Sequence, residues 1–346
     1  MPRRVPSLYS GRQRRTMATK LTDIAASTGF SVAAVSMAIN GKPGVSESTR
    51  AVILAEADRL GYRPNQSGRA LRLSRVGSIG IYTPASLMEY PLYYGEITRG
   101  VVAGLADSGY SPVMLPSASE TGDLRDLPAV DGYILVEPHS DDLGTHEILR
   151  GEAATVCIDP APPGSAEPWG VVESDTRTST TEALDIMVAR GSERPGLLTV
   201  ETVSQWTVSI EARYREWCAE RGIPPEVVRL DPGEGNGSLR QKLAAAIGEH
   251  AESCDGLFIC GDSIAVRIAG VLRSLGYVVG EDVKLVSGVD STMMEYHTPP
   301  ITSVDLSPLV FGQRAARMML ELLELPERPS AMRREVLPAP LVPRAT

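Results

Sequence analysis

The N-terminal part of the chain contains two short predicted helices joined by a glycine, and this pattern constrains the fold most. The first helix is predicted to begin at Thr22, whose hydroxyl can cap it, and to end at Thr28. Gly29 can adopt the left-handed backbone that a tight turn requires. Ser31 then caps a second helix over residues 32–39. This arrangement is typical of the helix-turn-helix motif, whose second helix reads bases in DNA.

The two helices are predicted to divide their side chains between a small core and an exposed face. The residues with the spacing of a shared core are Ile24, Ala25, Val35 and Ile39. The residues left facing outward on the second helix are Val32, Ala33, Ser36 and Met37. The second helix therefore offers a mostly apolar surface to a partner.

Two further motifs follow the helix pair. Residues 45–50, V-S-E-S-T-R, introduce a third amphipathic helix that is predicted to end at Gly61, where the sequence reads G-Y-R-P-N. With the helix pair, these motifs resemble the N-terminal segment of the LacI/GalR family of bacterial transcription regulators, and the resemblance extends along nearly the whole chain. It implies an N-terminal three-helix helix-turn-helix headpiece over residues 19–63, a hinge helix and linker over 64–75, and a two-lobed, periplasmic-binding-protein-like α/β domain over 76–346.

The resemblance assigns DNA contacts to the headpiece. It places base readout at Val32, Ala33 and Met37, which are apolar and are expected to read thymine methyl groups and DNA shape. The alternative is that these three side chains pack in the core. The positions that match phosphate contacts are Thr22, Ser31, Ser36, Asn40 and Asn65. For Thr22, Ser31 and Asn40 a helix-capping role is the alternative, and for Ser31 the two roles are compatible.

The hinge is short and polar, and Gly68 lowers its helix propensity. A helix of this length is marginal in water, so we expect it to order only when two copies meet over DNA. The resemblance implies that Ala70 and Leu71 enter the minor groove, where Leu71 acts as an apolar wedge. Leu71 could instead be a linker residue that packs on the body of the protein.

The net charge of −9 hides a strong asymmetry along the chain. Residues 1–75 hold 13 Lys and Arg against four acidic residues, whereas the remainder holds 21 basic against 39 acidic residues. The basic residues 1–75 are expected to be attracted to DNA phosphates, and the acidic remainder of the chain to be repelled by them. Residues 1–18 are Arg-rich and without periodicity, so we predict a disordered basic extension, either a passive one or a loose phosphate-binding arm.

From residue 76 onward, short apolar strands alternate with helices. This order predicts parallel sheets, and its length suits two α/β lobes better than one. The predicted strands are 78–82, 112–115, 132–136, 155–158, 196–200, 256–260 and 284–287. The predicted helices include 97–108, 178–190, 208–221 and 265–275.

The resemblance implies that the chain crosses between the lobes three times. We place the crossings near residues 172–175, 302–306 and 326–329. The N-lobe then comprises about 76–173 and 306–327, and the C-lobe about 174–303 and 328–346. Residues 117–130 depart from the family pattern, which predicts a reduced or missing helix there.

The resemblance also implies an effector site between the lobes. Tyr93 and Tyr94 match aromatic residues that cover the ligand, and Asp290 matches a carboxylate that binds sugar hydroxyls. Asp159 and Asp262 follow predicted strands, where open α/β sheets bind ligands, although an Asp there is often a cap or a turn former.

A basic residue that the family commonly uses to hold the ligand is missing. In the family motif R-x-x-G-[FY] the aromatic corresponds to Tyr214 and the arginine to Ile210. We consider Trp206 and Arg213 as partial replacements. The effector could therefore differ from a common hexose, or effector control could be lost.

Other function classes have weaker support. The four histidines are scattered and no Walker loop, GxSxG or HExxH motif occurs, so we expect neither an enzyme nor a bound cofactor or metal. The cysteines lack CxxC spacing and are expected to be reduced core residues. No apolar run approaches the roughly 18–20 residues of a membrane span, and no secretory signal is present, which favours a cytoplasmic protein.

The sequence therefore predicts a homodimeric repressor that binds a pseudo-palindromic double-stranded DNA operator. A small-molecule effector, expected to be a carbohydrate, controls it by changing the angle between the lobes. The alternatives are a DNA-binding regulator that responds to a protein corepressor, a sugar-binding protein without DNA function and a sugar-modifying enzyme.

Overall fold

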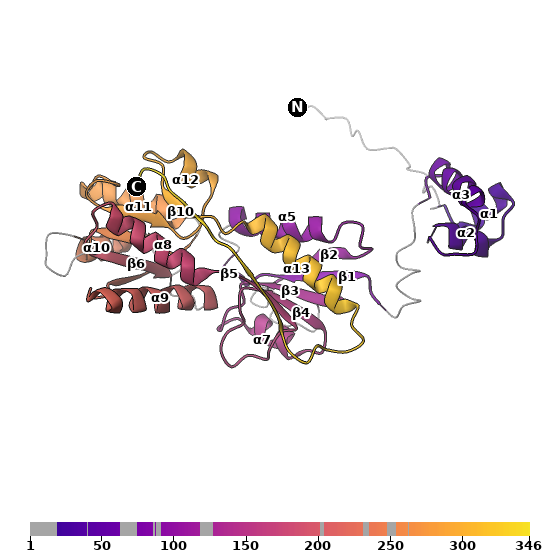
Figure 1. Cartoon of the computed structure of the whole chain (residues 1–346), viewed down its shortest axis with the longest axis horizontal. Coiled ribbons are helices and arrows are strands. Elements are labelled where there is room, and N and C mark those ends of the chain that lie inside the picture. The colour runs from indigo at the N-terminus through magenta and orange to yellow at the C-terminus, as the bar shows by residue number, and fades with distance from the viewer. Residues whose placement is uncertain are drawn as a thin grey trace, which may run out of the picture. The chain divides into compact units, whose positions relative to one another are not determined.

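The computed structural model describes most of the chain (Figure 1). The described residues are 19–39, 41–62, 75–85, 87, 91–117, 127–200, 204–230, 235–247, 254–261 and 263–346. The chain divides into two compact units, Met1–Leu73 and Ser74–Thr346. The predicted basic extension and the predicted DNA contacts Asn40, Asn65, Ala70 and Leu71 lie outside the described residues.

The first unit contains three helices in its described part. They are α1 (Leu21–Thr28), α2 (Val32–Ile39) and α3 (Glu47–Arg59). Their core is formed by fully buried Ile24, Val35 and Ile53, together with three alanines, Ala25, Ala38 and Ala57. This core confirms the predicted pairing of α1 and α2, except that Ile39 lies only partly buried at its margin.

The two helix starts differ in how well they were predicted. Ser31 caps α2 as expected, because its Oγ accepts a hydrogen bond from Ala34 N at 3.1 Å. The prediction that Thr22 caps α1 is wrong, because Lys20 is the capping residue and Thr22 lies inside the helix. The cause is Asp23, whose carboxylate accepts the Lys20 N–H at 2.7 Å, so that the helix is capped two residues before Thr22.

The second unit contains two sheets, each the centre of a lobe. The N-lobe sheet has the order β11-β5-β4-β3-β1-β2 with parallel pairings, and the C-lobe sheet has the order β12-β10-β9-β8-β6-β7 with only β12 antiparallel. The N-lobe strands are β1 (Ser78–Tyr82), β2 (Ser111–Met114), β3 (Gly132–Val136), β4 (Ala154–Ile158), β5 (Gly170–Ser174) and β11 (Arg333–Leu337). The C-lobe strands are β6 (Pro195–Val200), β7 (Val227–Leu230), β8 (Gly256–Ile259), β9 (Lys284–Ser287), β10 (Thr302–Val304) and β12 (Leu341–Val342).

All seven predicted strands are present, with ends shifted by at most one residue. The sequence analysis missed β5, β7, β10, β11 and β12. The strands β10 and β12 have three and two residues, too few for a recognisable pattern. The strand β11 begins Arg-Arg-Glu and is mostly exposed at the edge of its sheet, so it lacks the apolar run of a buried strand.

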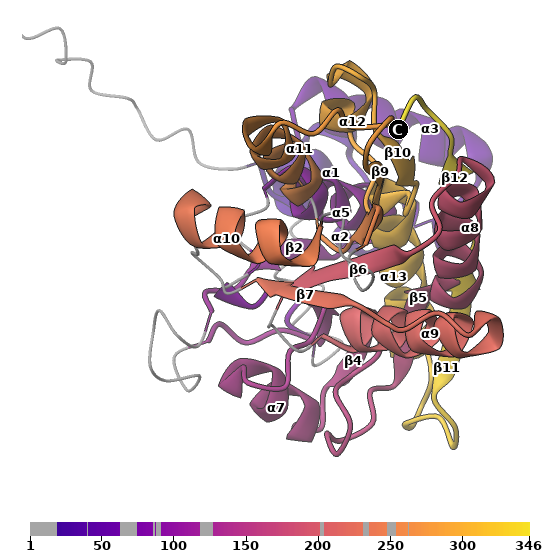
Figure 2. The same ribbon diagram turned by 90° about the vertical axis from the view of Figure 1, so that its left-hand side faces the viewer.

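Helices cover both sheets (Figures 1 and 2). The N-lobe has α5 (Pro91–Gly104), α7 (Leu143–Arg150) and α13 (Pro308–Leu323). The C-lobe has α8 (Thr176–Ala189), α9 (Gln205–Arg221), α10 (Asn236–Ala246), α11 (Ile264–Leu275) and α12 (Thr292–Tyr296). Figure 2 shows α8 and α9 side by side along one flank of the C-lobe sheet.

The helices α5 and α13 approach each other until their backbones touch. A Cβ atom added at Gly100 would lie 2.1 Å from Leu309 O, and one added at Gly312 would lie 2.1 Å from Ile97 O. Only glycine fits at these two positions. The start of α5, which carries Tyr93 and Tyr94, is therefore tied to the helix that follows the second crossing.

The chain crosses between the lobes at three places, and two of them match the prediction. The first crossing follows β5 at Asp175, and the second joins β10 to α13 through residues 305–307. The prediction of the third crossing at 326–329 is wrong, because β11 pairs with β5 in the N-lobe sheet. The chain crosses only at residues 338–340, so residues 328–337 belong to the N-lobe and not to the C-lobe. The predicted departure at 117–130 falls largely on residues 118–126, outside the described part.

Candidate DNA-binding and effector sites

The N-terminal turn of α2 presents an exposed apolar surface. Val32 is 44% exposed and Ala33 is exposed, whereas Val35 on the opposite face is fully buried. Ser36 and Met37 are half-buried, and the Met37 sulfur lies 3.2 Å from the position of a Cβ built on Gly44. Of the three predicted base-reading residues, Val32 and Ala33 therefore project freely, and Met37 partly covers the turn after α2.

Both ends of α2 are held by side chains. Ser31 caps the start, and Arg50 of α3 donates to Ala38 O at 2.8 Å and to Lys42 O at 2.7 Å at the other end. Arg50 ends the V-S-E-S-T-R motif, and its role was not predicted from the sequence. Its guanidinium satisfies carbonyl groups that a helix end leaves unpaired. The predicted phosphate contacts Thr22 and Ser31 are both exposed.

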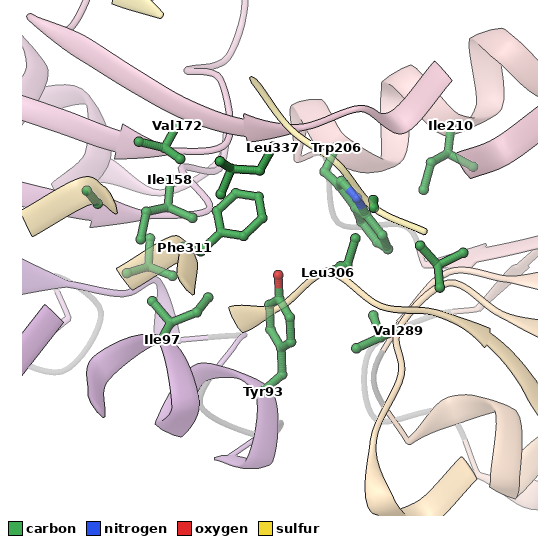
Figure 3. Packing of buried hydrophobic residues seen from close by; sticks show 14 of the residues in the cluster. Tyr93, Ile97, Ile158, Val172, Trp206, Ile210, Val289, Leu306, Phe311 and Leu337 are labelled. Atoms are coloured by element: carbon green, nitrogen blue, oxygen red, sulfur yellow. The ribbon is translucent and has the colours of Figure 1, made fainter. Parts of the chain in front are cut away.

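Apolar side chains from both lobes form one continuous cluster (Figure 3). Tyr93 of α5 and Trp206 of α9 extend toward each other from opposite lobes, and each is 8% exposed. Leu306 of the second crossing lies beside them in the same cluster. The other labelled members are Ile97, Ile158, Val172, Ile210, Val289, Phe311 and Leu337.

The buried side chains of α9 belong to this cluster. Trp206 and Ile210 are one turn apart in it, and Tyr214 and Trp217 of the same helix are further members. Arg213 is not brought to this site: its guanidinium donates to Glu220 at 2.8 Å and to Thr181 of α8 at 2.9 Å. The suggestion that Arg213 replaces the missing ligand-binding arginine is therefore not supported.

Three carboxylates lie at the carboxyl ends of neighbouring N-lobe strands. Glu137 follows β3, Asp159 follows β4 and Glu173 lies near the end of β5, and all three are buried. Burial, and then the charges of Glu137 and Glu173, raise the pKa of Asp159 well above its ordinary value, although a backbone hydrogen bond from Ser174 opposes this shift. Asp159 therefore keeps its proton to a higher pH than an exposed aspartate does, and the protonated form can donate a hydrogen bond.

Glu137 was missed by the sequence analysis, although it directly follows a predicted strand. The Tyr94 hydroxyl donates to its carboxylate, and burial together with this charge raises the pKa of Tyr94. Tyr94 also makes an edge-to-face contact with Tyr93, with ring centroids 5.1 Å apart. Glu137 lies close enough to the C-lobe to contribute, after burial and Glu211, to the raised pKa of Cys260.

Asp290 comes from the C-lobe, shortly after β9. Its Oδ1 accepts hydrogen bonds from Ser303 Oγ at 2.6 Å and from Arg344 Nη1 at 2.8 Å. The sequence analysis did not identify Arg344. The predicted site residue Asp262 lies outside the described residues.

Among the described residues, no group of three or more His, Cys, Asp and Glu could hold a metal ion. No single helix in this part of the chain is long and apolar enough to cross a membrane, and only α1 and α2 together, a pair bent by 111°, have the length and apolar composition for it.

Comparison with known proteins decides the family. A model described as "Bacterial regulatory proteins, lacI family" matches residues 20–65, and one described as "Periplasmic binding protein-like domain" matches residues 184–346. The HTH-type transcriptional regulator MalR of Streptomyces coelicolor is 31% identical over 319 residues, which cover 88% of this chain and 90% of the relative. The chain belongs to the LacI family. This LacI-family protein is also 27% identical over 325 residues to the HTH-type transcriptional regulator CelR of Thermobifida fusca, with 89% and 93% of the two chains covered.

Solved structures of LacI-family regulators have the same fold. The transcriptional regulator CelR–cellobiose complex superposes with a TM-score of 0.66 at 26% identity, covering 94% of this chain and 99% of the other. The lac repressor dimer bound to operator and the anti-inducer ONPF superposes with a TM-score of 0.73 at 21% identity, covering 95% and 99%. The predicted family and fold class are confirmed, and this LacI-family protein is a DNA-binding transcriptional regulator.

Proposed function

We propose that this LacI-family regulator is a cytoplasmic repressor that binds a pseudo-palindromic operator as a homodimer. The observation that carries the proposal is the geometry of α2, whose two ends are held by Ser31 and Arg50 while Val32 and Ala33 stay exposed between them. A rigid helix with a free apolar tip suits the major groove, where thymine methyl groups are apolar partners. The relative solved as a dimer on its operator supports the symmetric arrangement.

We assign base readout to Val32, Ala33 and Met37. Thr22, Ser31 and Ser36 are exposed or half-buried around this tip, as phosphate contacts must be. Asn40, Asn65 and the minor-groove residues Ala70 and Leu71 complete the proposed DNA contacts on the resemblance alone.

For the effector, we propose a small carbohydrate held between the lobes. Tyr93 and Trp206 offer apolar faces from opposite sides, Tyr94 and Asp159 offer polar groups, and Asp290 offers an acceptor. Asp262 is included on the resemblance alone, and Arg213 is left out because glutamates bind it elsewhere. The cellobiose complex of CelR supports a sugar as the ligand class.

The test of DNA binding is selection of genomic fragments by the full-length protein at near-physiological salt with bulk competitor DNA. We expect enrichment of one two-fold symmetric sequence, because specific contacts by paired α2 helices add to the salt-dependent phosphate term. Retention of fragments without any shared sequence would contradict the proposal.

A second candidate is a regulator that responds to a protein corepressor. The observation that favours it is the continuous apolar cluster between the lobes, with Ile210 at the position of the family arginine. Calorimetry of the full chain with cellobiose and other neutral disaccharides separates the two candidates. Saturable heat supports the sugar effector, its absence supports the corepressor, and turnover of any sugar would contradict our proposal that the protein is not an enzyme.

A further inference from the structure

The hydrogen bonds of Asp290 leave half of its carboxylate available. Ser303 Oγ and Arg344 Nη1 both donate to Oδ1, and Oδ2 has no partner among the described residues. The Asp290 side chain is 23% exposed. A carboxylate held through one oxygen presents the other as an oriented acceptor.

Arg344, the residue that holds Asp290, is itself fixed at both its backbone and its side chain. Its N–H donates to Thr302 Oγ1 at 3.0 Å, and its carbonyl accepts from Arg190 Nη2 at 2.8 Å. Its Nη1 also donates to Ile301 O at 2.9 Å, and the side chain is only 14% exposed. The guanidinium is therefore pre-organised beside Asp290, and its charge compensates the carboxylate.

The same contacts join Asp290 to two of the crossings. Ser303 lies on β10, which leads into the second crossing, and Arg344 follows β12, which continues from the third. The Asp290 N–H donates to Val304 O at 2.7 Å. The Asp305 N–H donates to Pro340 O at 2.9 Å, so the two crossings are also bonded to each other.

We propose that Arg344 is a positioning residue of the effector site, an inference that rests on the proposed sugar-binding function. Arg344 holds Oδ1 of Asp290 so that Oδ2 is left for a ligand hydroxyl, and it links this carboxylate to the crossings. Because the Asp290 charge is compensated, this part of the site selects a neutral, hydroxyl-bearing ligand over a cation.

The experiment uses the full chain and the variants Arg344→Met and Arg344→Lys. The matched control is Arg333→Met, since Arg333 of β11 forms an exposed ion pair with Glu321 of α13 at 2.7 Å. Hydrogen exchange of the peptides that contain Asp290 and Asp305 measures the link without any ligand. Calorimetry with cellobiose measures ligand binding, and unfolding curves verify that each variant is folded.

We expect Arg344→Met to speed amide exchange in both peptides about tenfold and to weaken cellobiose binding by about 10- to 100-fold, as for a lost charged hydrogen bond. Arg344→Lys restores part of the affinity because it keeps the charge, and Arg333→Met changes neither measurement. Unchanged exchange in Arg344→Met would overturn the link to the crossings. Faster exchange with unchanged cellobiose affinity would overturn the positioning role.

Failure of the proposed function has a different signature. If the wild type gives no heat with cellobiose or with the other neutral disaccharides, sugar binding is wrong and the positioning role falls with it. The exchange measurement still decides whether Arg344 links Asp290 to the crossings.

Discussion

The headpiece and the two-lobed body expose their proposed functional residues to very different degrees. Val32 of the headpiece is 44% exposed on a helix that packs against the two other described helices of that unit. In the body, Tyr93, Trp206 and Asp159 are all buried at the meeting of two lobes. The proposed DNA-reading residues of α2 all lie within one small unit. The proposed effector site exists only because distant segments of the body are packed together.

The largest expected effect is a destabilisation of the headpiece that leaves the stability of the body unchanged. Ile53→Ala leaves a cavity at a fully buried position, and we expect it to cost the headpiece about 3 kcal/mol. Operator binding should then disappear while the thermal transition of the body stays in place. If a calorimetric scan of the full chain shows both transitions shifting together, the headpiece and the body unfold as one cooperative unit and the comparison is wrong.

A substitution at the contact between α5 and α13 is expected to destabilise the body in the same way. Gly312→Ala forces a Cβ toward Ile97 O, and we expect it to destabilise the body by about 2 kcal/mol. The control is Gly270→Ala on α11, where a Cβ meets nothing within 4 Å and the better helix former should be neutral or slightly stabilising. Equal unfolding midpoints for the two variants would contradict the close backbone contact.

The two units are also expected to respond to pH in opposite directions. The folded body raises the pKa of Asp159 above its ordinary value of 3.8, so the folded state binds this proton more tightly than the unfolded chain does. The free energy of unfolding of the body therefore falls as the pH rises from 3.8 toward the raised pKa. Hydrogen bonds from Arg59 and Ser27 lower the pKa of Glu56 in the headpiece from 4.5 to about 2, so this contribution is lost as pH falls below 4.5.

Unfolding midpoints of both transitions between pH 3 and pH 7 check this difference. Asp159→Asn should make the unfolding midpoint of the body less dependent on pH. Glu56→Gln should do the same for the unfolding midpoint of the headpiece. An unchanged slope in Asp159→Asn would show that another group is responsible.

The smallest expected effect concerns the tip of α2. Val32→Ala should weaken operator binding about fivefold, roughly 1 kcal/mol, through lost contact with a thymine methyl group. The stability of the Val32→Ala variant should equal that of the wild type, because the Val32 side chain is exposed. Val52→Ala on α3 is the control, since Val52 is 53% exposed outside the proposed DNA surface. Equal operator affinity of the two variants in gel shift would remove Val32 from the readout.

Local patterns were enough to predict most elements. Apolar runs predicted seven of the strands, and the Ser31 cap and the Gly29 turn predicted α2. The prediction of the start of α1 failed because the Asp23 carboxylate, and not the Thr22 hydroxyl, accepts a hydrogen bond from a backbone N–H at that end. Prediction also failed for β11, whose charged residues form a strand only because β5 provides hydrogen-bonding partners.

The sequence by itself determined the headpiece, the alternation of strands and helices, and the family, because caps, turns and apolar periodicity act between residues close in the chain. Only the tertiary structure decided that Arg213 bonds Glu220 and Thr181, that the chain crosses for the third time after β11, and that Arg344 holds Asp290. Arg344 and Ser303, which share that carboxylate, are 41 positions apart. Contacts over such separations depend on how whole lobes pack, and no local pattern in the sequence records that packing.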